Sequence, residues 1–116
     1  MIEEVFGHFT LSEIQDTPVL TLKGEIDFSN VPDLQKALAA MPAEDVVIDM
    51  SEVEFMDSSA LAALVRYRKV TVSAGGSVTL VIASPLVLRV FEITNFDREF
   101  KIVKRLADVA GLFPKA

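Results

Sequence analysis

The chain contains no cysteine and a single histidine among its 116 residues. The lack of cysteine excludes disulfides, thiol catalysis and zinc–thiolate sites, and it fits a cytoplasmic location. Basic residues are also scarce, because 11 Lys and Arg stand against 17 Asp and Glu and give a net charge of −6. Proteins that bind nucleic acids or anionic membranes are usually basic, so we expect neither kind of partner.

Long apolar runs are missing as well. The longest that we find, residues 60–65, is far shorter than the ~20 residues that a membrane-spanning helix needs. The first residues are acidic, whereas a secretory signal begins with basic residues followed by apolar ones. We therefore expect neither a membrane span nor a secretory leader.

The composition that is present indicates a compact core. Hydrophobic residues make up 51% of the chain and charged residues 24%, a balance typical of folded proteins. A chain of 116 residues has the length of one ordinary domain, so we expect residues 1–116 to form a single domain.

Apolar periodicity predicts about five strands and about four helices. The strands are expected at residues 7–15, 19–23, 46–50, 78–83 and 100–103. The helices are expected from residue 29 or 30 to about 40, at residues 58–74, from residue 85 to about 95, and at residues 106–113. The first strand is expected at a sheet edge, in a hairpin with the second, which Gly24 ends. Strands and helices then alternate, which predicts an α/β domain with a mostly parallel or mixed sheet.

Residues 46–61 are the most informative segment. They predict a buried strand, a short acidic loop, and a helix that Asp57 caps. Ser58 then lies at a helix N-terminus, where backbone N–H groups and the helix dipole favour a phosphate. Ser59 is the weaker candidate for the same role. The segment therefore predicts a protein that is switched by phosphorylation.

Asp27 follows the second predicted strand. In a parallel α/β sheet the strand-to-helix loops gather at one end, so Asp27 and Asp57 are expected to form an acidic rim for a basic partner. Two carboxylates also suit metal binding or acid–base catalysis. However, the chain supplies neither a nucleophile–base pair nor a complete set of metal ligands. We therefore expect no enzyme, no metal and no cofactor.

Residues 55–61 (Phe-Met-Asp-Ser-Ser-Ala-Leu) resemble a motif of the anti-sigma-factor antagonists of the STAS family, Asp-Ser-Ser/Thr-Gly-Leu at a helix start. Residues 24–27 resemble the family's Gly-x-Leu-Asp, residues 75–80 its Gly-Gly lead-in to a strand, and residues 84–94 its Ser-Pro helix. The resemblance covers about residues 10–113. The chain departs from the family at Ala60, where Gly is usual, and at residues 95–96.

The resemblance implies a bacterial regulator of transcription that works by partner switching. Its unphosphorylated form would bind an anti-sigma factor, often a serine kinase, which then releases its sigma factor. The kinase would phosphorylate Ser58, and a serine phosphatase would reset the switch. The residues implied in partner binding are Asp27, Asp57, Ser58, Ser59 and Ala60.

Two alternatives stay open at this point. The first is a STAS protein that does not switch and acts as a scaffold or as a transporter accessory. The second is a phosphoaspartate receiver domain, because residues 46–50 resemble a receiver's acceptor strand and would place the acceptor at Asp49. The opening hairpin does not suit the doubly wound fold of a receiver.

Overall fold

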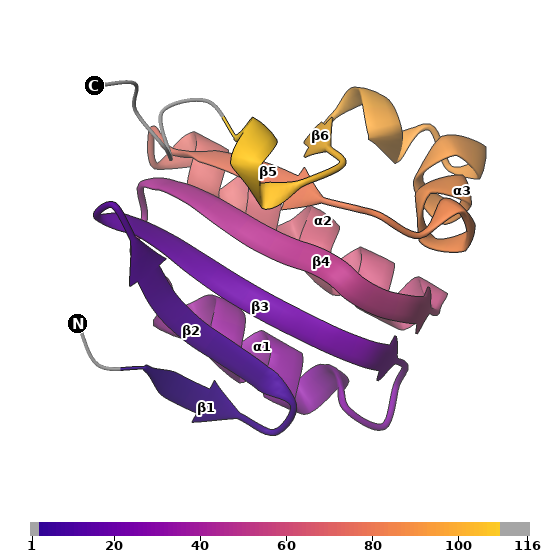
Figure 1. Ribbon diagram of the computed structural model, residues 1–116, viewed down its shortest axis with the longest axis horizontal. Coiled ribbons are helices and arrows are strands. Elements are labelled where there is room, and N and C mark those ends of the chain that lie inside the picture. The colour runs from indigo at the N-terminus through magenta and orange to yellow at the C-terminus, as the bar shows by residue number, and fades with distance from the viewer. Residues whose placement is uncertain (1–2, 110–116) are drawn as a thin grey trace.

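A six-stranded mixed sheet organises the protein (Figure 1). The structure is a computed structural model and describes residues 3–109. The strands lie in the sheet in the order of the chain: β1 (Glu4–Phe6), β2 (Phe9–Ile14), β3 (Thr17–Ile26), β4 (Asp45–Met56), β5 (Ser77–Val81) and β6 (Lys101–Val103). The first three strands are antiparallel neighbours, and β3 to β6 are parallel neighbours. The predicted α/β class and the opening hairpin are confirmed.

The sheet begins with a strand that the sequence did not predict. β1 pairs antiparallel with β2, so β2 is an interior strand and the prediction of an edge there is wrong. β1 has three residues, two of them exposed, which is too short and too exposed to show a period of two. Gly7 makes the turn to β2 with a φ of +60°, a backbone conformation that glycine adopts without strain.

Two predicted strands end too early. β3 does not stop at Gly24 but continues to Ile26, with register shifts against β4 on either side of residues 23–24. Gly24 has a φ of +77° within this strand and still pairs with Val53 of β4. β4 likewise continues to Met56, so the predicted acidic loop is strand. The exposed Glu52 and Glu54 flank the buried Val53 as in a strand, and a register shift against β3 interrupts this alternation before the buried Met56.

Three α-helices follow the hairpin: α1 (Val31–Ala40), α2 (Ser58–Ser73) and α3 (Pro85–Ile93). Asp57 caps α2 as predicted, because its carboxylate accepts from the backbone N–H groups of Ser59 and Ala60. Ser84 caps α3, and its hydroxyl accepts from the N–H of Val87 at 3.4 Å. Asn30, which precedes α1, is also a residue type that is common at N-caps, although its side chain makes no capping hydrogen bond.

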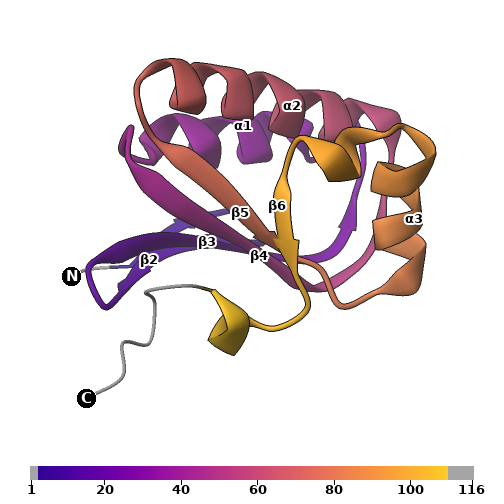
Figure 2. The same ribbon diagram turned by 90° about the horizontal axis from the view of Figure 1, so that it is seen from above.

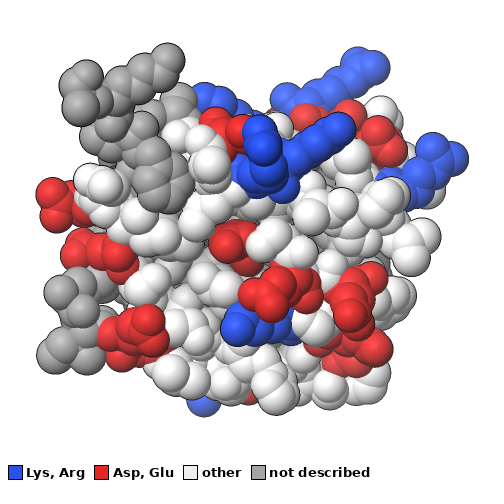
Figure 3. Space-filling model, viewed as in Figure 1, with Lys and Arg blue, Asp and Glu red and all other residues white. Residues whose placement is uncertain are grey.

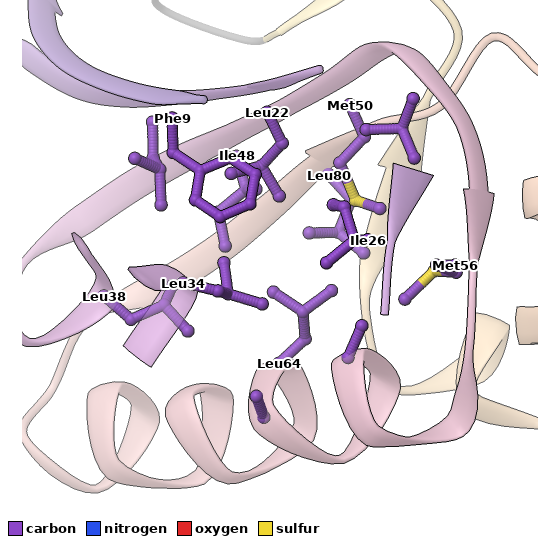
Figure 4. Close-up of a cluster of buried hydrophobic side chains, with 14 of the residues drawn as sticks. Phe9, Leu22, Ile26, Leu34, Leu38, Ile48, Met50, Met56, Leu64 and Leu80 are labelled. Atoms are coloured by element: carbon purple, nitrogen blue, oxygen red, sulfur yellow. The ribbon is translucent and has the colours of Figure 1, made fainter. Parts of the chain in front are cut away.

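The helices α1 and α2 cover one face of the sheet, and α3 lies at the end where the parallel strands finish (Figures 1 and 2). Between sheet and helices lies the main core, whose apolar side chains Figure 4 shows pointing toward one another. The strands contribute alternate residues to it, and each helix contributes one stripe. Members that are completely buried include Phe9, Leu22, Ile26, Leu34, Ile48, Met50, Leu64 and Leu80.

The other face of the sheet carries a smaller cluster. It is built from Val19, Val47 and Val81, and Leu106 and Val109 pack against it (Figure 2 shows the crossing segment). The predicted helix at residues 106–113 is not an α-helix where it is described: Leu106–Asp108 is a 3-10 turn, η2. Residues 110–113 lie outside the described residues. A second 3-10 turn, η1 (Phe96–Arg98), follows α3.

Candidate functional site

The sequence-predicted site residues gather at the carboxyl ends of β3 and β4. The two strands finish side by side, because Ile26 pairs with Met56 and the N–H of Asp57 donates to the carbonyl of Ile26 at 3.0 Å. The loop at residues 27–30 therefore lies against the start of α2. This is the predicted meeting of Asp27 and Asp57 at one end of the sheet.

Asp57 is the central acceptor of the site. Its Oδ1 accepts from the Ser59 hydroxyl at 2.6 Å and from the N–H groups of Ser59 and Ala60 at 3.0 Å, and its Oδ2 accepts from the N–H of Phe28 at 3.0 Å. The hydrogen bond from the Ser59 hydroxyl is the largest cause that holds the pKa of Asp57 below its ordinary value, against the opposing effect of partial burial. The three backbone N–H groups lower the pKa further. Asp57 is therefore a charged, fixed anchor that joins the loop at residues 27–30 to the start of α2.

The loop with Asp27 is fixed from both sides. The Oδ1 of Asn30 accepts from the N–H of Asp27 at 2.9 Å, and the Nδ2 of Asn30 donates to the carbonyl of Glu25 at 2.8 Å. Asp27 in turn accepts from the N–H and the hydroxyl of Ser29. Asn30 occupies the predicted cap position of α1, but its side chain holds the loop and does not cap the helix. The sequence did not predict this role, because Asn before a helix suits both a helix cap and a turn that bonds to the backbone.

The two serines differ in their surroundings. Ser59 is half-buried and its hydroxyl is engaged by Asp57, whereas Ser58 is exposed and its hydroxyl makes no hydrogen bond within residues 3–109. Ser58 borders a shallow groove of about 290 Å³ whose other walls are Leu61, Ala62, Val65, Arg66 and Phe96. Phe96 is half-buried, packs against the main core and borders this groove beside Ser58.

The start of α2 differs from the predicted phosphate cradle in one respect. Asp57 already engages the N–H groups of Ser59 and Ala60, and the N–H of Leu61 donates to the Asp57 carbonyl. These three donors are therefore not free to hold a phosphate on Ser58, because each N–H group is already satisfied. The cation that borders the same groove is Arg66.

Ala60 does not belong to the surface. Its side chain is 0% exposed and packs in the main core, so this side chain does not form part of a partner-binding surface. Sequence reasoning placed it in the site because it adjoins Ser59, but the helical turn points it inward.

Charge divides the molecule into two sides. Residues 1–57 carry 13 acidic and 2 basic side chains, and residues 58–116 carry 4 acidic and 9 basic ones. The sheet follows chain order, so the division is also spatial, and Figure 3 shows basic side chains gathered toward β6 and α3, with acidic ones below. The candidate site lies on the boundary, with Asp27 and Asp57 on its acidic side and Arg66 on its basic side.

Other chemistries find little support at this site. Within the described part of the chain no group of three or more His, Cys, Asp or Glu side chains is arranged to hold a metal ion. Asp49, the acceptor in a receiver domain, lies in the middle of β4, where it pairs with Thr21 and Val81 and accepts from the N–H of Ser51 at 3.0 Å. A receiver acceptor stands at a strand's carboxyl end, so that alternative fails. No helix within residues 3–109 is long and apolar enough to cross a membrane.

Comparison with known proteins gives a consistent result. The family model described as the STAS domain matches residues 8–109. An anti-sigma-B factor antagonist of Bacillus subtilis strain 168 is 32% identical over 78 residues, which cover 66% of this chain and 72% of that protein. A STAS-domain containing protein of Pseudomonas aeruginosa is 29% identical over 85 residues, 72% of this chain and 84% of that one. The crystal structure of an anti-sigma factor antagonist from Mycobacterium paratuberculosis superposes with a TM-score of 0.78 at 28% identity and covers 86% of this chain and 87% of that chain.

Proposed function

This chain belongs to the STAS domain family and is similar to anti-sigma factor antagonists, and we propose that its unphosphorylated form binds an anti-sigma factor and thereby frees a sigma factor. The relatives' names describe regulators that act on another protein and not enzymes. In this proposal the anti-sigma factor is a serine kinase that phosphorylates Ser58 and releases the antagonist. A serine phosphatase then resets the switch.

The contrast between Ser58 and Ser59 carries the proposal. A kinase must reach a hydroxyl that projects from the surface, so that its oxygen can attack the γ-phosphate of ATP while its proton passes to a base of the kinase and ADP leaves. Ser58 meets both conditions, whereas the hydroxyl of Ser59 is half-buried and donates to Asp57 at 2.6 Å. Two neighbouring serines on one helix therefore have different roles: Ser59 fixes the cap, and Ser58 accepts the phosphate.

The phosphate would act through charge. It adds about −1.5 to −2 charges at neutral pH, next to the fixed carboxylate of Asp57 and close to Asp27. The hydrogen bonds of Asp57 hold the first turn of α2 and leave Ser58 at the surface. A phosphate on Ser58 therefore projects into solvent, and little rearrangement of the helix is needed to admit it. A partner that packs apolar or acidic groups on Ser58 then loses affinity, because it must desolvate the phosphate or is repelled by it. The fold itself is expected to stay intact.

The test begins with the anti-sigma factor that co-purifies with the wild-type chain. This partner is produced separately and mixed with the wild-type chain, with and without ATP and Mg²⁺. We expect a complex without ATP, and with ATP a mass increase of one phosphate, mapped to Ser58, together with dissociation. Phosphate on another residue would overturn the assigned switch. A complex that persists with unchanged mass would favour the non-switching scaffold instead.

A further inference from the structure

The strand β4 is longer than its neighbour β5. β5 pairs with β4 only from Asp45 to Asp49, whereas β3 pairs with β4 as far as Met56. Residues 51–56 of β4 therefore have a neighbouring strand on one side only. On the other side, β5 ends at Val81 and α3 starts at Pro85. The helix α3 packs beside β4 there. The result is an interrupted sheet edge inside the molecule, at the same end as Ser58.

This edge faces a groove, which we call the β4–α3 groove. Its main hollow has a volume of about 520 Å³, and a smaller one of about 200 Å³ continues it toward α3. Both hollows are bordered by Glu54 and Leu86, so they form one continuous feature. The main hollow is lined by Ser51, Glu52, Val53, Glu54, Ser84 and Leu86.

The groove carries large apolar side chains that the fold does not bury. Leu86 is 75% exposed and Phe55 is 51% exposed, and both border the smaller hollow. Contiguous apolar side chains at the surface, rimmed by polar ones, mark places where another molecule packs. Val70 is 69% exposed near the far end of α2, and it lines neither of these two hollows.

The polar rim of the groove is acidic and weakly engaged. Glu52 lies 3.8 Å from Lys23, and both side chains are more than half exposed, so their attraction is largely screened by water. Glu54 forms no salt bridge with any residue that the structure describes. The occupant that complements this rim is positively charged.

We propose that the β4–α3 groove binds an extended basic segment of the anti-sigma factor, with one apolar residue of that segment packed on Leu86 and Phe55. This inference rests on the proposed function for the partner's identity. An extended segment suits the site because it can align with the unpaired side of β4 and place alternate side chains toward the two glutamates. The partner contact then extends from Ser58 across the end of the sheet to α3.

The first test needs no partner protein. An acetylated, amidated peptide of sequence Lys-Arg-Lys-Leu-Lys-Arg is titrated into isotope-labelled protein, with Glu-Asp-Glu-Leu-Glu-Asp as the matched control. We expect the basic peptide, and not the acidic one, to shift the amide signals of residues 51–55 and 84–87, with an effect that falls as salt rises. Shifts spread evenly over the acidic half of the protein, or no shifts in the groove, would overturn the proposal.

The second test uses the anti-sigma factor that co-purifies with the wild-type chain. We expect Leu86→Ser and Glu54→Lys each to weaken binding at least tenfold, while the matched changes Val70→Ser and Glu44→Lys leave it within about twofold. All four side chains are exposed, so thermal unfolding should show intact folding.

Weakening by Ser58→Asp without weakening by the groove variants would reject the groove and keep the proposed switch. The reverse pattern would keep the groove and reject the switch. A self-associating chain whose dimer is broken by Leu86→Ser would assign the groove to a second copy and overturn the proposal.

Discussion

The Oδ2 of Asp57 accepts a hydrogen bond from the backbone N–H of Phe28 at 3.0 Å, across 29 residues of sequence. The other oxygen of the same carboxylate caps α2. One side chain therefore joins the loop after β3 to the helix after β4. This loop and the start of α2 are held in place before any partner arrives, which lowers the conformational entropy lost on binding.

Replacing Asp57 by Ala is expected to lower the free energy of unfolding by about 1–2 kcal/mol at pH 7, because the helix cap and the loop contact are lost together. The pKa of Asp57 is lowered in the folded state, so its charge stabilises the fold above the unfolded pKa of about 3.9. This contribution is lost as pH falls through the lower, folded pKa. Chemical denaturation of both proteins from pH 7 to pH 2 measures the difference.

The matched control for this experiment is Asp57→Asn, which keeps one acceptor oxygen and removes the charge. At pH 7 we expect Asp57→Asn to lose less unfolding free energy, relative to wild type, than Asp57→Ala loses. This loss should shrink further below about pH 3.9, because wild-type Asp57 is then being neutralised. A deficit that grows on acidification would contradict the assigned pKa shift.

Replacing Ser58 by Asp is expected to weaken binding to the anti-sigma factor by about a hundredfold, equivalent to ~2.7 kcal/mol. The added charge stands at the start of α2, where a negative side chain is favourable, so stability should be unchanged or slightly higher. Ser58→Ala should bind as tightly as wild type, stay bound in ATP, and gain no phosphate. Calorimetric titration and intact mass measure these outcomes.

Ser73→Asp is the matched charge control for this switch. Ser73 is exposed at the opposite end of the same helix, ~22 Å away for 15 residues of α-helix. Its replacement should leave binding unchanged. Equal weakening by both variants would mean that net charge, and not the place of Ser58, controls the affinity.

Replacing Ala60 by Gly introduces the residue that the resemblance leads one to expect. We expect a loss of about 1 kcal/mol in unfolding free energy, because Gly is the poorer helix former and a buried methyl group disappears from the core. The rate of phosphorylation by the kinase should stay unchanged, since the methyl group is not at the surface. A marked rise in that rate would show that Ala60 limits access to Ser58 after all.

The sequence predicted the elements that depend on local pattern. α2 and its cap could be found because Asp57, an apolar stripe and a glycine stop agree with one another. The end of β4 could not be found in this way, because residues 51–54 carry two glutamates that also suit a loop. Their strand conformation comes from pairing with β3, a contact between distant parts of the chain.

The site shows the same limit. The positions of Asp27 and Asp57 followed from the general rule for parallel sheets, but their hydrogen-bond partners did not. The engagement of Ser59, the loop contact of Phe28 and the burial of Ala60 each depend on a few ångströms of helix placement. The β4–α3 groove was missed because strand lengths in three dimensions, and not composition, create it.

The last prediction concerns Asp27 and separates its charge from its role in the loop. Asp27→Lys should weaken binding to the anti-sigma factor about tenfold or more, because it places a positive charge on the acidic side of the site, where a basic partner is expected. Asp27→Asn keeps an acceptor for Ser29 and should weaken binding less. Glu44→Lys, an exposed reversal that precedes β4 at the opposite end of that strand, serves as the control and should have little effect. Binding titrations at low and high salt test whether the effect comes from charge. The difference in affinity between Asp27→Lys and wild type should narrow as salt screens the charges. A salt-independent loss would point to a damaged loop, and unchanged binding would place the partner surface elsewhere.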